Sequence, residues 1–225
     1  MNPPWSTPAN RGGPVVAVDG PAAAGKGTLA RCLADALGLP YLDTGLLYRA
    51  VGRIALDAGR DPAQPAQDIA QALLAADLQR PDLRVAEVAQ AASKVAAQPA
   101  VRAALVDTQR RFALDRGAVL DGRDIGTAIF PDADVKLFIT ASPATRAMRR
   151  FLQMGGDSTA PDCAARLHEM EAALRARDTA DASRDVAPMR AAADAHVIET
   201  DTLSAQAVLA EALRIARARL AIIRA

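Results

Sequence analysis

The chain has 225 residues, of which 51% are hydrophobic and 24% charged, and its formal net charge is +1. This length can bury a full core and suits one α/β domain or a core with a small insert. The balanced charge excludes the basic excess that binds duplex nucleic acid or an anionic membrane. Its two cysteines, Cys32 and Cys163, lack the spacing of a zinc site or a disulfide framework. A reducing, cytoplasmic location is therefore expected.

Residues 1–13, "MNPPWSTPANRGG", are polar and rich in proline, with no apolar stretch. They predict a disordered tail and not a signal peptide. The longest apolar runs elsewhere are interrupted by arginines, so no membrane span is expected. We expect a monomer with neither nucleic acid nor membrane as a partner.

In chain order, the first predicted element is a strand over Val15 to Asp19, an unbroken apolar run that ends in turn residues. A glycine-rich loop follows it directly. From Gly25 the apolar residues recur at helical spacing, and Gly38 is placed to end that helix as a C-cap. Strand, glycine loop and helix in this order form the context that a phosphate-binding loop requires.

The segment 40–45, "PYLDTG", predicts a second strand, with Thr44 as the N-cap of a helix that runs to about residue 58. The following part of the chain predicts an all-helical insertion. Pro81 and Pro99 separate its three expected helices. These helices are expected near residues 67–76, 84–97 and 99–114.

The rest of the chain alternates apolar runs with helical patterns. Strands are expected at 118–124, 135–140 and 196–200, and helices at 143–154, 162–177 and 204–222. With the first two strands this gives an α/β fold with a mostly parallel, five-stranded sheet, whose ligands bind at the carboxyl ends of the strands.

The loop "GPAAAGKGT" has the composition of an anion site. Backbone N–H groups in a glycine turn form a concave cradle, and the next helix adds about half a positive charge at its N-terminus. Lys26 is one of only three lysines in the chain, so compositional drift does not explain it. A compact ammonium group can reach between the β- and γ-phosphates of a nucleotide. The loop residues are Gly20, Pro21, Ala22, Ala23, Ala24, Gly25, Lys26, Gly27 and Thr28.

Gly27 stands where the strict phosphate-loop pattern has Ser or Thr. The first hydroxyl available to Mg²⁺, directly or through water, is therefore that of Thr28. This displaced Thr resembles the loop of nucleoside monophosphate kinases more than that of GTPases, and no NKxD motif is present. Asp121, after an apolar run, could hold the Mg²⁺ water shell, but a strand-end Asp that caps local amides is equally compatible.

Arginines are the second group of candidates. Arg123, with Asp124, follows a predicted strand, which favours ligand contact. The segment 177–184, "RDTADASR", could close as a lid whose arginines neutralise transferring phosphoryl charge, or it could be a solvated helix end. The pair Arg146 and Arg150 has the spacing of a phosphate or adenine contact, although a solvated helix face is favoured.

The chain shows no obvious catalytic base, which suits an acceptor that is already an anion and needs only placement. Arg49, Arg102 and Arg123 come from three separate segments and could converge on an acceptor phosphate as bidentate donors. Each of these arginines taken alone could equally be a surface residue.

Five segments together resemble the bacterial cytidylate kinases, from Val15 essentially to the C-terminus. They are "DGPAAAGKGTLA", "LDTGLLYRA", "AASKVAAQPAVRAAL", "LDGRDIGTAIFPDADVKLFITAS" and "RDTADASRDVAP". The resemblance implies a three-layer αβα fold of the P-loop NTPase type and transfer of the ATP γ-phosphoryl group to CMP or dCMP, with Mg²⁺ as cofactor. It also implies a core of residues 14–59 and 114–225, a lid near 155–187, and an acceptor-binding insert at 60–113.

The resemblance also assigns roles to individual residues. The loop from Gly20 to Thr28 holds ATP, with Lys26, Arg177 and Arg184 at the transferring group. Asp124, accepting from the exocyclic amine, reads the cytosine edge together with Ser93, and Arg102 assists. The other acceptor contacts are Thr44, Tyr48 and Arg49 along the nucleotide, Arg102 and Arg123 at its phosphate, and Asp181 and Arg184 at its sugar. Thr28 and Asp121 are the candidate magnesium residues.

The chain departs from the family pattern at three places. Only "LQRPDLRVA" stands where the family usually has a small antiparallel sheet, Ala180 and Ala182 occupy lid positions that often carry cations, and "AAA" replaces a loop Ser or Thr. Two alternatives remain open at this point. One is another small-molecule P-loop kinase that acts on UMP, AMP or shikimate, and the other is a nucleotide-binding regulator without catalysis.

Overall fold

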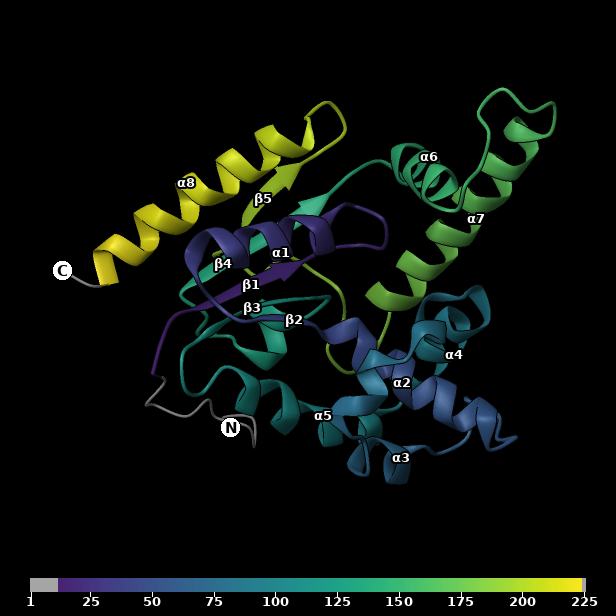
Figure 1. The fold of residues 1–225 in the computed structure, drawn as a ribbon, viewed down its shortest axis with the longest axis horizontal. Helices are drawn as coiled ribbons and strands as arrows, with labels where there is room; N and C mark the ends of the chain where they lie inside the picture. The colour runs from purple at the N-terminus through teal and green to yellow at the C-terminus, as the bar shows by residue number, and fades with distance from the viewer. Residues whose placement is uncertain (1–11, 224–225) are drawn as a thin grey trace. The chain divides into compact units, whose positions relative to one another are not determined.

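The computed structural model describes residues 12–223, and its five strands form one parallel sheet in the order β2-β3-β1-β4-β5 (Figure 1). Residues 1–11 of the predicted tail lie outside the described residues. The strands are β1 (Val15–Asp19), β2 (Tyr41–Asp43), β3 (Ala118–Gly122), β4 (Val135–Thr140) and β5 (His196–Glu199). The expected fold class is confirmed.

The chain divides into two compact units. The first comprises Met1–Gly13 and Leu42–Gly117, and the second comprises Pro14–Tyr41 and Ala118–Ala225. The predicted insert, residues 60–113, lies inside the first unit, which also includes residues 42–59. The domain boundaries drawn from the sequence remain a prediction.

The first unit is helical over most of its length. Leu47, Val51, Val95, Val101 and Leu105 are buried together where its helices meet. Its elements are α2 (Thr44–Asp57), α3 (Gln67–Gln71), α4 (Ala86–Ala96), α5 (Pro99–Phe112) and two 3₁₀ helices, η1 (Ala75–Gln79) and η2 (Pro81–Arg84).

Two details of the first unit differ from the sequence prediction. Asp43 is the N-cap of α2, and Thr44 is already its first helical residue. The helix expected over 67–76 ends at Gln71, because the chain continues into the 3₁₀ helices η1 and η2. The segment "LQRPDLRVA" therefore runs from the end of η1 through η2 to the start of α4.

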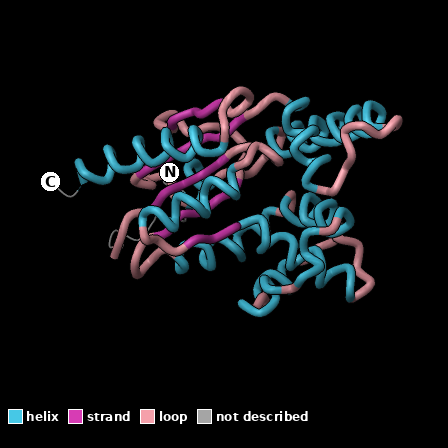
Figure 2. The backbone as a smooth tube through the Cα atoms, turned by 45° about the horizontal axis from the view of Figure 1, so that its top comes forward, coloured by secondary structure: helices cyan, strands magenta, loops and turns pink. Residues whose placement is uncertain are grey.

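The second unit contains the sheet and its covering helices. Every residue of β1 and of β3 is buried, as their continuous apolar runs predict. The helices α1 (Lys26–Leu37) and α8 (Ala205–Ile223) pack against each other and share one apolar core with the sheet, which includes Leu33, Val119 and Ala212. Figure 2 shows the strands of the sheet running side by side beneath these helices.

The other elements of this unit are α6 (Pro143–Gln153), α7 (Cys163–Ala182) and a π-helical segment, η3 (Ile125–Ile129). The helices α6 and α7 pack against each other (Figure 1). Two sequence expectations are corrected here: α7 continues past residue 177 to Ala182, and residues 125–129 form a helical turn that the sequence pattern did not predict. No helix among the described residues is long and apolar enough to cross a membrane.

Candidate phosphate-binding site and its neighbours

The glycine loop follows β1 and turns sharply into α1, and its first two glycines are needed for different reasons. Gly20 has φ 146°, and a Cβ at this position would lie 2.0 Å from the carbonyl oxygen of Ile139 on β4. Gly25 has φ 91°, and a Cβ added there would meet nothing within 4 Å, so this glycine is required for its conformation alone. Ala23 adopts φ 61° between them. The neighbouring structure must hold this left-handed alanine.

Lys26 is the first residue of α1, and its side chain is buried. Its ammonium group lies 3.5 Å from the carbonyl oxygen of Pro21, so the lysine folds back along the loop. The N-cap of α1 is Gly25, which has no side chain, so the N–H groups of the first turn are not capped by it. Thr28 lies in the same first turn, exposed to solvent. The loop thus offers amides and one ammonium group to an anion.

Asp121 ends the apolar part of β3 next to the loop. It is buried, and its Oδ1 atom accepts a hydrogen bond of 3.2 Å from the hydroxyl of Tyr41. A Cβ on Gly27 would lie 3.2 Å from the other carboxylate oxygen of Asp121. A side chain at position 27 would crowd this carboxylate, whereas Gly27 leaves room for it. The carboxylate oxygens of Asp121 and the hydroxyl oxygen of Thr28 are atoms of the type that Mg²⁺ prefers as ligands.

Asp19, the last residue of β1, was not singled out by the sequence reasoning. Its carboxylate accepts 2.8 Å hydrogen bonds from the backbone N–H groups of Ile125 and Gly126, which begin the π-helical segment η3. Burial raises the pKa of Asp19 to about 7, against the lowering effect of these two bonds and of Lys26, while Asp124 raises it further. Asp19 therefore holds the start of η3, and the charges of Lys26 and Asp124 both act on its carboxyl group.

Asp124 is the N-cap of η3 and is buried. Its carbonyl oxygen accepts hydrogen bonds from the N–H groups of Ala128 and Ile129, at 2.8 and 3.2 Å. Backbone geometry therefore fixes the position of this residue at the carboxyl end of β3, which is where the sequence placed a ligand-binding residue.

Three charged residues predicted to bind the acceptor meet in the second unit. Arg123 donates from Nε to Oδ2 of Asp181 at 3.1 Å, and Arg184 donates to Oδ1 of the same carboxylate. The Asp181 side chain is only 2% exposed, so water competes little for the hydrogen bonds that it accepts from both guanidinium groups. We refer to Arg123, Asp181 and Arg184 as the arginine triad. Arg177 lies one helical turn before Asp181 on α7 and is partly buried.

The sequence favoured a solvated helix face for Arg146, and the structure shows that this expectation is wrong. Arg146 is 2% exposed and donates to the carbonyl oxygens of Ala141 and Ala22, at 3.0 and 3.2 Å, and to the carboxylate of Asp178. No spacing rule could have identified this contact, because Ala22 and Asp178 are distant from Arg146 in the sequence.

The first unit contains the remaining predicted acceptor residues. The guanidinium carbon of Arg102 lies 5.4 Å from the ring centre of Tyr48, and Arg102 also donates to the carbonyl oxygen of Ala96 at 3.3 Å. Arg49 donates to the carbonyl oxygen of Leu83 at 2.8 Å. Ser93 bonds to its own helix, at the carbonyl oxygen of Ala89.

These contacts bring Tyr48 and Arg102 together, whereas Arg49 is anchored to η2. Thr44 is buried at the start of α2. Convergence of these side chains with Arg123 on one phosphate stays a prediction.

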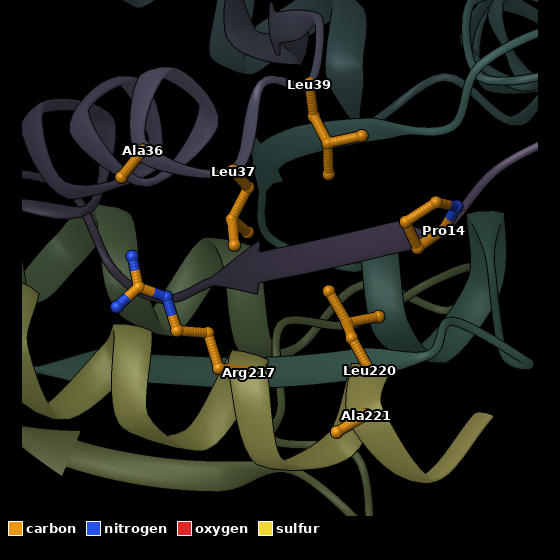
Figure 3. A pocket seen from close by; sticks show the side chains of 7 residues that line it. All are labelled: Pro14, Ala36, Leu37, Leu39, Arg217, Leu220 and Ala221. Carbon is orange, nitrogen blue, oxygen red and sulfur yellow. The ribbon is translucent and has the colours of Figure 1, made fainter. Parts of the chain in front are cut away.

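A cavity of about 420 Å³ lies away from the loop, near the residue that precedes β1 (Figure 3). The loop follows the carboxyl end of the same strand, so the two features belong to opposite ends of β1. The side chains around the cavity are mainly apolar, and Arg217 is the one cation among them. They are Pro14, Ala36, Leu37, Leu39, Arg217, Leu220 and Ala221.

A parallel sheet with a glycine loop and a lysine between its central strand and the next helix defines a P-loop NTPase-type fold. Within that class, the family model "Cytidylate kinase" matches residues 16–218. A curated cytidylate kinase of Granulibacter bethesdensis is 58% identical over 206 residues, which cover 90% of this chain and 96% of the relative. The chain belongs to the cytidylate kinase family.

A second curated relative agrees with this assignment, and one solved structure is similar in fold. A cytidylate kinase of Acidiphilium cryptum is 56% identical over 193 residues, covering 85% of this chain and 89% of the relative. A solved structure of an uncharacterized protein from Eubacterium ventriosum has a TM-score of 0.53 at 15% identity, and covers 91% of this chain and 98% of that one. This structural likeness supports the fold alone.

Proposed function

We propose that the protein transfers the γ-phosphoryl group of ATP to CMP and to dCMP, giving ADP and the corresponding diphosphate. The observation that carries this proposal is the chemistry gathered at the carboxyl ends of β1 and β3 in a chain of the cytidylate kinase family. There the loop amides and Lys26 are of the kind that bind an anion, and Asp19 holds the segment that follows Asp124.

In this proposal the protein positions two anions and neutralises charge. The loop N–H groups and Lys26 orient the donor phosphates, Arg123 and Arg102 are the predicted donors to the acceptor phosphate, and Asp181 and Arg184 are the predicted contacts of its sugar. Because a phosphate acceptor is already ionised, no side chain has to remove a proton from it. Mg²⁺ bound with ATP, near Asp121 and Thr28, would neutralise charge on the donor phosphates. Arg177 adds positive charge at the transferring group.

Asp124 gives a physical reason to select cytosine. Its carboxylate can accept a hydrogen bond from the exocyclic amine of cytosine, whereas the uracil carbonyl would place two acceptors opposite each other. Such a mismatch costs about 1 to 3 kcal/mol. CMP is therefore expected to be used in preference to UMP.

A coupled assay with CMP, dCMP, UMP, AMP and shikimate as acceptors tests the proposal. Formation of ADP is expected with CMP and dCMP, and much less with the other three acceptors. A preference for AMP or shikimate would contradict the choice of acceptor. Tight ATP binding with no CDP product would instead identify a non-catalytic nucleotide-binding protein.

A further inference from the structure

Arg146 is buried between three parts of the second unit. It projects from α6, and its Nε atom donates to the carbonyl oxygen of Ala141, between β4 and α6, at 3.0 Å. Its Nη1 atom reaches the carbonyl oxygen of Ala22 in the phosphate loop, and both terminal nitrogens bind the carboxylate of Asp178 on α7. A guanidinium group with its N–H groups engaged in this way is held in one orientation.

The loop needs such a support at this point. Ala22 precedes Ala23, whose φ of 61° lies in the left-handed region that a residue with a Cβ occupies at a cost of about 1 to 2 kcal/mol. The carbonyl of Ala22 points toward Arg146, and the side chain of Ala22 packs against Ala147 and Leu174. The two helices thereby fix both the carbonyl and the side chain of Ala22.

Fixing this carbonyl also fixes the next amide, because the peptide unit is planar and its C=O and N–H point in opposite directions. The N–H of Ala23 is therefore directed away from Arg146 by the same contact that holds the carbonyl of Ala22. In a phosphate loop, the binding strength depends on amides that are already oriented before the anion arrives.

Asp178 links this support to the arginine triad. It lies on α7, one residue after Arg177 and three residues before Asp181. The carboxylate that orients Arg146 and the carboxylate that orients Arg123 therefore belong to consecutive turns of one helix. A change in the position of α7 would reach the loop through Arg146.

We propose that Arg146, oriented by Asp178, is a positioning residue that sets the loop amides for the donor phosphates and couples the loop to α7. The inference rests on the proposed function, since it takes the loop as the ATP site. It assigns no contact between Arg146 and a nucleotide.

The variants Arg146→Lys and Asp178→Asn test this proposal. Lysine keeps the charge but cannot bind Ala22, Ala141 and Asp178 in a fixed plane, and asparagine keeps the shape of Asp178 without its charge. The affinity for a non-hydrolysable ATP analogue is measured by calorimetry without any acceptor, and kcat and the KM for CMP are measured separately. We expect at least about fivefold weaker analogue binding and a lower kcat for each variant, with the KM for CMP within about twofold of wild type.

A matched control pair is available on α7. Arg175 and Glu171 form an arginine–carboxylate pair of 2.6 Å on the exposed face of the helix. The variants Arg175→Lys and Glu171→Gln should leave analogue binding and kcat unchanged. The thermal midpoint of every variant, measured without ligand, separates a loss of stability from a loss of loop orientation.

The double variant gives the decisive result. If Asp178 acts through Arg146, the double variant should bind the analogue no more weakly than the weaker of the two single variants. Analogue affinity and kcat within about twofold of wild type in folded Arg146→Lys and Asp178→Asn proteins would overturn the proposal, and so would fully additive losses. Should Arg146→Lys fail to fold, Asp178→Asn alone decides, by the same two measurements.

The assay also separates this inference from the proposed function. If the wild-type protein forms no CDP from CMP, the choice of acceptor is wrong, whereas the calorimetric comparison still reports on Arg146. If the wild-type protein forms CDP and the variants bind the ATP analogue normally, only the role of Arg146 is wrong.

Discussion

Among the individual side chains, the charged groups of the site fall into two kinds, those meant for a ligand and those that hold the backbone. We expect Lys26 to belong to the first kind, since it is buried at the first residue of α1, directly after the loop. Asp19 belongs to the second, because both of its oxygens accept backbone N–H groups of η3.

Replacing Lys26 tests whether this side chain binds the ligand. Lys26→Ala should lower kcat by about 100-fold or more, because one charged donor at a transferring phosphoryl group is lost. Steady-state kinetics with ATP and CMP measure the effect, and circular dichroism checks that the fold is retained. Lys94→Ala, at an exposed lysine of α4 that pairs with Asp61, is the control. Unaltered turnover in the Lys26 variant would remove the loop from the mechanism.

Asp124 is expected to act on the acceptor alone. Asp124→Asn should raise the KM for CMP by about tenfold, because the carboxylate acceptor for the exocyclic amine is replaced by a weaker neutral group. The preference for CMP over UMP should narrow, since an amide can also donate to the uracil carbonyl. Kinetics with both acceptors at saturating ATP measure this, and a KM that rises equally for ATP would contradict the assignment.

Asp19 predicts a pH dependence of stability. Its pKa is about 7 in the folded chain against an ordinary value of 3.8, so the folded state binds the proton more tightly than the unfolded state does. The associated stability is complete below pH 3.8 and is lost as the pH rises to about 7, by up to about 4 kcal/mol.

The variant Asp19→Asn cannot ionise, so it should lack this loss. Urea unfolding at several pH values should show that the difference in free energy of unfolding, variant minus wild type, increases from about pH 4 to about pH 7 and is constant above that range. A difference independent of pH would mean that Asp19 keeps an ordinary pKa in the folded protein.

Among the helices and strands, the sequence predicted the positions of the five strands and of most helices along the chain, because apolar periodicity and the flanking glycines and prolines are local signals. It missed η3, because that turn is held by Asp19, which lies 106 and 107 positions from its two backbone partners. It ended α7 too early, since the polar residues 177–182 look like a loop, whereas Asp178 and Asp181 are held by distant arginines.

The same reasoning applies to the candidate site. The loop and Lys26 could be predicted because strand, loop and helix are contiguous in the chain. The buried position of Arg146 could not be predicted, because arginines at this spacing on α6 are equally compatible with a helix face exposed to solvent. The pairing of Arg123 with Arg184 through Asp181 also depends on the tertiary fold, as Arg123 and Asp181 lie 58 positions apart.

The loop itself carries a stability prediction. Gly20→Ala should destabilise the protein by at least about 2 kcal/mol and abolish ATP binding, because the added Cβ would lie 2.0 Å from the carbonyl oxygen of Ile139. Gly38→Ala is a control for backbone strain, since φ there is 66° and nothing lies within 4 Å of the added Cβ. It should cost about 1 kcal/mol and leave nucleotide binding intact. Chemical denaturation measures both changes, and equal losses would exclude the steric explanation.

For the molecule as a whole, charge is balanced overall but organised into many local ion pairs. Arginines or lysines lower the pKa values of several exposed carboxyl groups of both units. Such groups contribute stability above their unfolded pKa values, and that stability is lost as the pH falls through their lower folded values. These groups include Asp57, Asp68, Asp194 and Glu211.

We therefore expect the free energy of unfolding to fall in acid below about pH 4. This loss is separate from the effect of Asp19, which lowers stability as the pH rises toward 7. Because the pairs are exposed, salt should screen them, so the acid loss should be shallower in about 0.5 M NaCl than in dilute buffer. Thermal unfolding over a pH series at two salt concentrations measures this. If stability falls equally steeply with decreasing pH at both salt concentrations, the loss comes from buried groups instead.

Asp181 has a consequence for how tightly an acceptor can be held. The carboxylate already satisfies part of the hydrogen-bonding capacity of Arg123 and Arg184. On the proposed function, an arriving acceptor would find both guanidinium groups already oriented, which saves conformational entropy, but it would also compete with the Asp181 carboxylate for them. The same carboxylate would bind the two cations again when the diphosphate departs. Such a competing anion would limit product retention and so would favour rapid turnover over maximal affinity.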